Sequence, residues 1–377
     1  MTQEGTVLAA ARRLLAERAA AVRAGTRSGY AGADEVELMA AVGLSPVTYE
    51  DVRSSGAPPA SAGSPGEPGG VAQVAATLRY RVAGHDRADR TSRRLVTLHR
   101  TSAGWRISGE APAPGAPSLP WDVDGAVVAE GERSLVVGAL DRAGATAYTR
   151  LADAAVGAVD AAWQRPWSRR LLVVVAADAA GVRAQVGGSA DLDQLAAVTD
   201  GPVGADGLAT GDRVVLDRAA MDGLTAVGRE FVVRHETVHV ALRSSLAGRA
   251  PRWVTEGFAD HVGYSGTGLD QVQVAAGLLD QVAAGSGPEA LPDDGDFDPA
   301  GGDIAPAYAA AWIAVEQVAR AVGPSGLRRF VVAATSAGSA ESAQAATAGA
   351  FEEVLGTTEE AFTRAWRQRP AELASAR

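Results

Sequence analysis

The sequence contains no cysteine and no lysine, and each absence excludes a group of mechanisms. Without cysteine there is no disulfide scaffold, thiolate zinc site, iron–sulfur cluster or cysteine nucleophile, so a metal ion would have to be bound by His, Asp or Glu. Because all 35 basic residues are arginines, lysine-based catalysis is excluded as well. The absence of cysteine is compatible with a reducing or an oxidising compartment.

Long apolar runs are also missing. The best candidate, Leu171 to Ala177, has the length of a strand, whereas a membrane helix needs about 18 consecutive apolar residues. We therefore expect no transmembrane segment. Met1 to Glu4 does not form a basic region followed by an apolar one, so we expect no signal peptide in this chain.

The composition is that of a globular protein, with 47% hydrophobic and 21% charged residues. The 377 residues suggest two or three domains, and two is our working number. The formal net charge of −10 argues against nucleic acid and anionic membranes as partners. Residues 1–120 carry 14 arginines and 11 acidic residues, whereas residues 121–377 carry 21 and 34, which suggests two units of different origin.

The N-terminal part is predicted to be a small α+β domain over residues 1–115. A helix is expected from Gly5 to Gly25, because Leu8, Leu15 and Val22 recur every seven residues. Segments rich in β-formers predict an antiparallel sheet: Val47–Val52, Val71–Val82, Ser92–Arg100 and Gly104–Ser108. The Gly-, Ser- and Pro-rich residues 54–70 are expected to be a flexible loop, and the proline-rich residues 111–120 mark the domain boundary.

The second predicted domain covers residues 121–377 and is mostly helical in its C-terminal half. We expect a hairpin at Ala126–Val137, a helix at Ala145–Trp163 and strands at Leu171–Ala176 and Arg213–Leu216. After Ala219 the pattern predicts helices almost throughout.

A five-residue motif, His235-Glu236-Thr237-Val238-His239, carries the clearest chemical signal in the chain. It lies in a segment, Gly228 to Leu242, that is predicted to form a largely buried helix. Positions four apart share one face of a helix, so both imidazoles can bind one metal ion. Glu236 lies about 100° around the helix axis and can reach a metal-bound water molecule.

A catalytic zinc site needs a third protein ligand and keeps one position open for water. Glu256 follows His239 by seventeen residues, and Asp260 lies one helical turn beyond it. We predict that Glu256 binds the metal and that Asp260 holds a ligand histidine through its other ring nitrogen, as metal-bound histidines usually require. Asp260 as the ligand is the less favoured assignment.

The motif HETVH followed by WVTEGFAD resembles the gluzincin branch of zinc metallopeptidases, the thermolysin-like peptidase MA group. The layout is also similar to actinobacterial proteins in which a cystatin-like or SnoaL-like α+β domain precedes a gluzincin domain. The resemblance implies a Zn²⁺ cofactor bound by His235, His239 and Glu256, and a peptide or protein substrate. No Gly-x-Met-Glu-Asn-like strand of the aminopeptidases and no third histidine of the metzincins is found.

The resemblance implies hydrolysis of a peptide bond by an activated water molecule, with Glu236 as general base. A second donor for the oxyanion is then needed, and Tyr308 at the start of a predicted helix is the first candidate, ahead of His261 and Tyr264. The segment Arg213–Leu216 is expected to be an edge strand along which a substrate backbone can pair.

A different class of function stays open: a ligand-binding or sensor protein that uses the N-terminal domain, or that holds zinc without turnover. The acidic run at Asp293, Asp294, Asp296 and Asp298 fails the EF-hand pattern and is predicted to be a solvated loop. His85 and His99 are expected to be ordinary surface or strand residues. No phosphate-binding loop is found, and the resemblance favours an extracytoplasmic or cell-envelope location over a cytoplasmic one.

Overall fold

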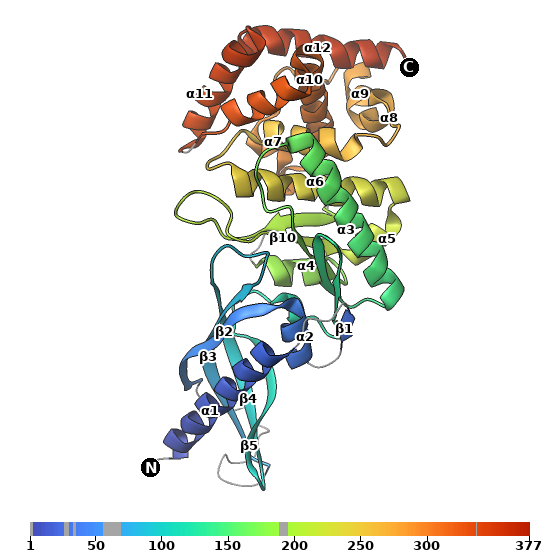
Figure 1. Cartoon of the computed structure of the whole chain (residues 1–377). Helices are drawn as coiled ribbons and strands as arrows, with labels where there is room; N and C mark the ends of the chain where they lie inside the picture. The colour runs from blue at the N-terminus through green and yellow to red at the C-terminus, as the bar shows by residue number, and fades with distance from the viewer. Residues whose placement is uncertain (1–2, 26–29, 33–34, 56–68, 188–194, 337) are drawn as a thin grey trace. The chain divides into compact units, whose positions relative to one another are not determined.

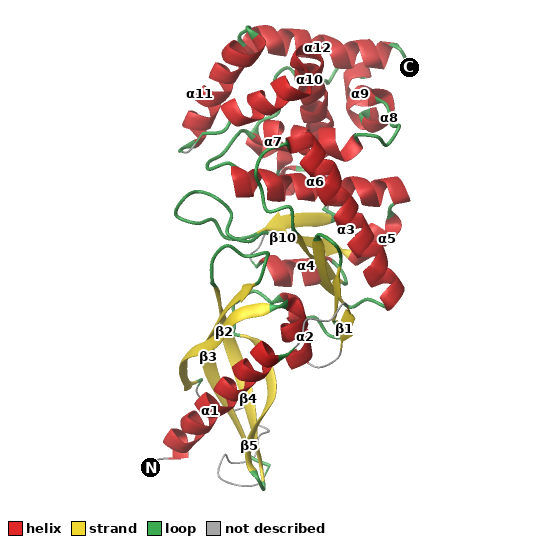
Figure 2. Cartoon of the chain, in the orientation of Figure 1, coloured by secondary structure: helices red, strands yellow, loops and turns green. Residues whose placement is uncertain are grey.

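The computed structural model describes residues 3–25, 30–32, 35–55, 69–187, 195–336 and 338–377 (Figure 1). It contains two β-sheets, and the regular elements that follow Asp217 are helices (Figure 2). The expected mixed α+β class is therefore confirmed. Among the described helices, none combines the length and the apolar character that crossing a bilayer requires.

Contacts divide the chain into two compact units. The first consists of Met1–Arg150, Leu172–Ser189 and Val215–Arg218, and the second of Leu151–Leu171, Ala190–Val214 and Ala219–Arg377. Each unit draws on separate stretches of chain, whereas the sequence predicted a single boundary between residues 115 and 121. The division into separate domains at residues 1–115 and 121–377 stays a prediction.

The first unit begins with helix α1 (Gln3–Ala24), which packs on a four-stranded antiparallel sheet. Val7, Ala11 and Leu15 on α1 share one apolar cluster with Val74 and Val96 on the sheet. The helix and the strands predicted in this part are confirmed, while residues 56–68 of the predicted flexible loop lie outside the described residues. The strands, in hydrogen-bonded order, are β2 (Leu44–Ser54), β3 (Val71–Val82), β4 (Arg90–Thr101) and β5 (Gly104–Pro112).

A fully buried arginine stands inside the first unit. Arg94 on β4 donates to Glu110 at 2.8 Å and makes two hydrogen bonds to Asp122, at 2.9 and 2.5 Å. Asp122 ends the short 3-10 helix η1 (Pro120–Asp122), so this ion cluster joins residues from both sides of the predicted boundary. A buried charge needs such partners, because an unpaired one is strongly destabilising.

The second sheet has the strand order β1-β6-β7-β8-β10-β9. The predicted hairpin is confirmed, since Val127 pairs with Gly138 across β6 and β7. The expectation that Arg213–Leu216 forms an edge strand is wrong. Its strand, β10, lies between β8 and β9, and all five of its residues are buried. The bounds are β1 (Tyr30–Gly32), β6 (Val127–Glu130), β7 (Ser134–Gly138), β8 (Leu171–Ala176), β9 (Ala197–Asp200) and β10 (Arg213–Asp217).

Helices predominate in the chain after Ala219, as predicted. The helices that follow β7 are α3 (Arg142–Trp163), α4 (Ala179–Val186), α5 (Arg218–Gly223), α6 (Ala226–Ser245), α7 (Arg252–Tyr264), α8 (Gln271–Val274), α9 (Ala276–Ala283), α10 (Ala305–Ala333), α11 (Ala340–Ala350) and α12 (Glu359–Ser375). Three short helical turns, η2 (Asp294–Phe297), η3 (Pro299–Gly301) and η4 (Phe351–Leu355), connect some of them.

Helix α7 packs closely against both α6 and α10. The approach to α10 depends on Gly257, since a Cβ atom there would lie 2.5 Å from the carbonyl oxygen of Ala311. On the other side, Gly263 lies against the ring of Phe231 on α6, where a Cβ atom would meet a ring carbon at 2.7 Å. These two glycines let α7 lie close enough to bring its acidic side chains to the histidines of α6.

Candidate metal centre

Helix α6 positions both histidines of the sequence motif. Thr225 caps its N-terminus by accepting a hydrogen bond from the amide of Gly228 at 3.1 Å. The predicted helix Gly228–Leu242 is confirmed, and in the structure it extends from Ala226 to Ser245. His235 and His239 lie one turn apart, and their Nε2 atoms are 3.1 Å from each other.

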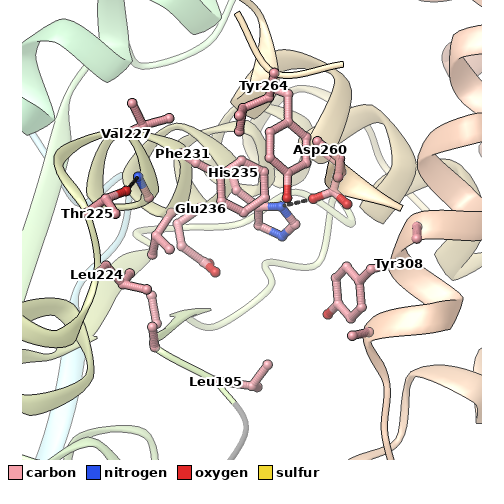
Figure 3. A pocket seen from close by; sticks show the side chains of 18 of the residues that line it. Leu195, Leu224, Thr225, Val227, Phe231, His235, Glu236, Asp260, Tyr264 and Tyr308 are labelled. Atoms are coloured by element: carbon pink, nitrogen blue, oxygen red, sulfur yellow. Dashed lines mark hydrogen bonds and ion pairs between the residues drawn. The ribbon is translucent and has the colours of Figure 1, made fainter. Parts of the chain in front are cut away.

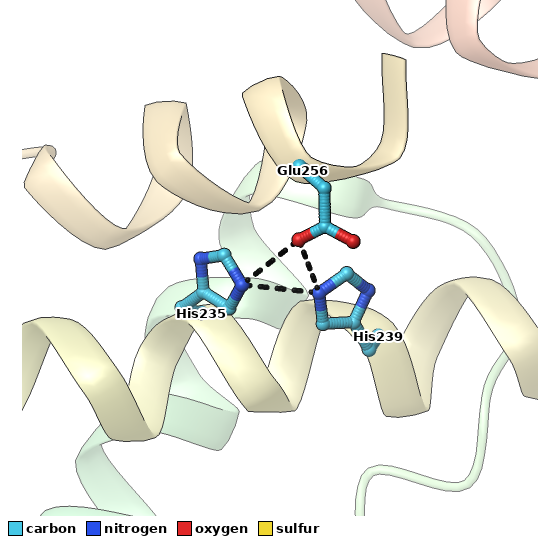
Figure 4. A group of neighbouring side chains, drawn as sticks. All are labelled: His235, His239 and Glu256. Carbon is cyan, nitrogen blue, oxygen red and sulfur yellow. Dashed lines mark hydrogen bonds and ion pairs between the residues drawn. The ribbon is translucent and has the colours of Figure 1, made fainter. Parts of the chain in front are cut away.

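The carboxylate of Glu256 on α7 completes a cluster of three ligand atoms (Figure 4). Its Oε2 atom lies 3.3 Å from Nε2 of His235 and 3.2 Å from Nε2 of His239. Tetrahedral zinc with bonds of about 2.0–2.1 Å would place its ligands roughly 3.3–3.4 Å apart. The spacing of these three atoms therefore fits a small tetrahedral ion, and this buried group can hold a metal ion.

Asp260 holds His235 from the opposite side of the imidazole ring. Its Oδ1 atom lies 2.8 Å from Nδ1 of His235, and it sits one turn after Glu256 on the same helix. In neutral His235 the proton belongs on Nδ1, where it is donated to Asp260, so Nε2 keeps its lone pair. The Nε2 atoms of His235 and His239 and the Oε2 atom of Glu256 then point at one another as electron-pair donors, with no proton required between them. A cation placed among these three atoms would stabilise the arrangement.

The pKa shifts in this cluster reflect burial and the short contacts between the histidines and the carboxylates. Burial lowers the pKa of His235, but hydrogen bonds to Asp260 and Glu256 outweigh burial and hold the pKa well above its usual value. Burial raises the pKa of Asp260. Burial acts in the same direction on Glu256, yet the two histidines outweigh it and hold the pKa of Glu256 well below the ordinary range.

Glu236 is not part of the ligand cluster, in agreement with its predicted role. Its carboxylate faces a cavity of about 750 Å³ that is also lined by His235, Asp260 and Tyr308 (Figure 3). Thr199 on strand β9 donates its hydroxyl hydrogen to Oε2 of Glu236 at 2.6 Å. Thr199 was not predicted from the sequence, because a lone threonine in a short strand belongs to no motif.

The wall of this cavity is predominantly apolar. A cavity of this size with few polar groups is typical of a binding site for an organic ligand or a peptide segment. Its apolar side chains come from residues at and around the starts of β9, α6 and α10 and from the segment between α7 and α9: Leu195, Ala196, Ala197, Leu224, Val227, Phe231, Val232, Leu269, Val274, Ile304, Ala305 and Ala309.

Tyr308 lies in the first turns of α10, as predicted, and its ring centroid is 6.1 Å from that of His235. Burial and then the negative charge of Glu256 raise the pKa of its hydroxyl, so Tyr308 stays protonated and can donate a hydrogen bond. Figure 3 shows its hydroxyl and the Glu236 carboxylate both directed into the cavity, from α10 and α6. The first candidate for the oxyanion donor is thus close to the ligand cluster.

The two other candidates for the oxyanion donor, Tyr264 and His261, lie in different places. Tyr264 lines the cavity, where its ring stacks on Phe231 with centroids 4.1 Å apart. His261 is not among the lining residues, and its Nδ1 atom lies 2.6 Å from Oε1 of Glu316. A second missed residue, Arg252 at the start of α7, lies 4.0 Å from Oε1 of Glu256.

Most of the residues judged ordinary in the sequence behave as expected. The four aspartates of the acidic loop are exposed. Asp293 and Asp298 cap backbone amides of the loop, and Asp294 accepts from the amide of Arg252 at 2.8 Å. His99 is exposed on β4, as expected, whereas His85 is partly buried in the turn after β3 and is neither a surface nor a strand residue.

No family model, curated protein or solved structure matches this chain. The chemical inferences therefore depend on the geometry of the described residues.

Proposed function

We propose that the protein is a zinc-dependent metallopeptidase of gluzincin type. The observation that carries this proposal is the position of Glu256, whose single carboxylate oxygen lies within 3.3 Å of the Nε2 atoms of both motif histidines. Two imidazoles and one carboxylate form a ligand set that zinc enzymes use when a fourth position is left for water. The neighbouring Glu236 and Tyr308 supply the groups that peptide hydrolysis needs.

A zinc ion at this position would act as a Lewis acid on the scissile carbonyl and on the attacking water. The protein's own contribution begins with Glu236, which takes the proton from the attacking water and later delivers it to the leaving amine. Thr199 holds Oε2 of Glu236 through its hydroxyl hydrogen, and this leaves Oε1 free to face the water. The carboxylate is thereby fixed in one orientation before the substrate enters.

Charge that develops on the carbonyl oxygen needs a hydrogen-bond donor. The protonated hydroxyl of Tyr308, on the far side of the cavity from Glu236, is suited to this role. A peptide segment lying between α6 and α10 would place its carbonyl between the general base and the donor. The apolar cavity wall lowers the effective dielectric constant around these groups, which strengthens both interactions.

Metal analysis of the purified protein combined with the substitution Glu236→Gln tests the proposal. We expect one equivalent of zinc in both proteins, cleavage of a broad peptide library by the wild type, and at least about a hundredfold slower cleavage by Glu236→Gln, since a general base contributes about 10²–10⁴-fold. The control is Glu230→Gln, an exposed glutamate on the same helix. Turnover that survives Glu236→Gln would refute the mechanism.

The alternative, a zinc-containing binding or sensor protein, predicts another result. Stoichiometric zinc without cleavage of any library member, in protein shown to be folded, would favour it over the peptidase.

A further inference from the structure

A second cavity, of about 610 Å³, lies within the second unit next to the metal cavity. Tyr264 and Leu269 contribute to the walls of both. Unlike the first cavity, this one contains two guanidinium groups, from Arg320 on α10 and Arg369 on α12. Its apolar wall is formed by Leu269, Val272, Trp312 and Leu373.

Both guanidinium groups converge on one neutral atom. Oε1 of Gln271 accepts hydrogen bonds from Nε and one terminal nitrogen of Arg369, at 3.0 and 2.8 Å, and from Arg320 at 3.4 Å. Two like charges drawn to a single amide oxygen repel each other, and a neutral acceptor compensates this repulsion only weakly. An anion placed beside Gln271 would relieve it.

The two acidic residues in the cavity wall, Asp270 and Glu316, each already have a hydrogen-bond partner. Glu316 binds His261 with 2.6 Å between Oε1 and Nδ1, and Asp270 caps helix α8 by accepting from the amide of Gln273. Arg369 has one carboxylate neighbour, Glu372, at 3.4 Å, and among the described residues Arg320 has none within salt-bridge distance. The indole N–H of Trp312 also has no acceptor among those residues.

We propose that this cavity is a binding site for a carboxylate carried on an apolar body, held by Arg320 and Arg369. A planar carboxylate matches the paired donors of a guanidinium, and the side chains of Trp312 and Leu373 would contact the apolar part. The carboxylate belongs either to a small organic acid or to a peptide. The site is separate from the ligand cluster and does not depend on the proposed peptidase activity.

The two cavities lie along one face of α10. Tyr308, Trp312, Glu316 and Arg320 follow one another at intervals of four residues, so Arg320 lies about 18 Å along the helix from Tyr308. A carboxylate bound at Arg320 would therefore be too far away to reach the histidines, unless it belongs to a peptide of roughly five or more extended residues.

Binding of 3-phenylpropionate to the full-length, zinc-loaded protein, measured by calorimetry, tests this inference. We expect saturable binding, with 3-phenylpropionamide binding at least about tenfold more weakly because it lacks the charge. Arg369→Gln and Arg320→Gln should each weaken binding of the carboxylate by about tenfold or more. Arg364→Gln, an exposed arginine on the same helix α12, is the matched control and should bind like the wild type.

The substitution Gln271→Glu separates loss of the site from loss of folding. It places a carboxylate between the two guanidinium groups, so we expect a stable protein that no longer binds the probe. Unchanged probe binding by Gln271→Glu, or equal binding of the acid and the amide, would overturn the proposal. The proposal would also be overturned if His239→Ala lost binding of the probe while Arg369→Gln retained it, because the probe would then occupy the metal centre.

Two peptides distinguish the possible sources of the carboxylate. A pentapeptide with a phenylalanine at its free C-terminus and the same peptide with an amidated C-terminus are compared with the small acid. Tighter binding of the free peptide than of 3-phenylpropionate assigns the site to a peptide terminus, and binding of the small acid alone assigns it to a free organic acid.

Discussion

At the scale of single residues, His235 has the most constrained environment in the candidate centre. Its two ring nitrogens meet different partners, with Asp260 at Nδ1 and the ligand cluster at Nε2. The Asp260 contact fixes the ring orientation and keeps the lone pair of Nε2 directed toward His239 and Glu256. Metal affinity should therefore depend on a residue that does not itself touch the ion.

The substitution Asp260→Asn tests this dependence. We expect the zinc dissociation constant to rise by about 10–100-fold, because the amide is a weaker partner for the Nδ1 proton. Competition with a chromophoric chelator measures it. Asp222→Asn, at an exposed position on α5, is the control and should leave the affinity unchanged. An unaltered affinity in Asp260→Asn would show that the hydrogen bond does not support the metal.

Thr199 offers a second test at this scale, aimed at Glu236 rather than at the metal. Thr199→Val removes the hydroxyl that binds Oε2 of Glu236 and keeps the shape of the side chain. We expect kcat to fall by about tenfold with zinc content and KM nearly unchanged, since one hydrogen bond to a charged group is lost. Thr199→Ser should restore most of the rate. Equal rates for all three proteins would contradict a positioning role.

The residues of the candidate centre divide into those that local sequence can reveal and those that it cannot. The spacing of His235 and His239 predicts a shared helix face, and the four-residue interval from Glu256 to Asp260 predicts a ligand with its supporting carboxylate. Thr199 reaches the site only through the packing of β9, so no local spacing identifies it, whereas Arg252 lies one helical turn before Glu256 on α7 and shares the four-residue interval. Tyr308 could be named as a candidate, but its distance from His235 depends on how α10 packs.

At the scale of secondary-structure elements, the centre depends on how closely α7 approaches its neighbours. Glu256 is followed directly by Gly257, whose missing side chain lets α7 contact the backbone of α10 at Ala311. The glycine and the ligand occupy adjacent positions, so a change in helix spacing would displace the carboxylate. The packing of these helices therefore controls the coordination geometry.

Gly257→Ala should lower stability and metal affinity together. The added Cβ atom would lie 2.5 Å from a backbone oxygen that cannot move independently, so we expect a cost of about 1–3 kcal/mol in the free energy of unfolding. Chemical denaturation and a chelator titration measure the two effects. The matched control is Gly277→Ala in α9, where nothing lies within 4 Å of the new Cβ atom and stability should rise by about 0.4–1 kcal/mol.

Elements were easier to predict from the sequence than their arrangement. An apolar repeat located α1, and apolar or β-forming composition located α6 and the strands of the first sheet, because each pattern reflects local burial. The order of strands in the second sheet is set by long-range pairing, which leaves no local trace. Arg213–Leu216 was therefore identified as a strand but assigned wrongly to an edge.

At the scale of the whole molecule, a bound metal would act as a cross-link between α6 and α7. A ligand that binds only the folded state stabilises it by an amount that grows with the logarithm of the free ligand concentration, about 4 kcal/mol at a thousand times the dissociation constant. The same ligand groups also bind protons, so the metal ion and protons compete for them.

The difference in melting temperature between the zinc-loaded and the chelator-treated protein should therefore grow from pH 5 to pH 8. Without metal, the raised pKa of His235 contributes stability that is fully present below its unfolded value of about 6.5 and is lost as pH rises through its higher folded value. With metal, the imidazole must be deprotonated, so the contribution of the ion increases over the same interval. Calorimetric melting at several pH values, with Glu256→Gln as a variant of weakened binding, measures this divergence. A difference that is constant with pH would mean that the ion is not bound through His235.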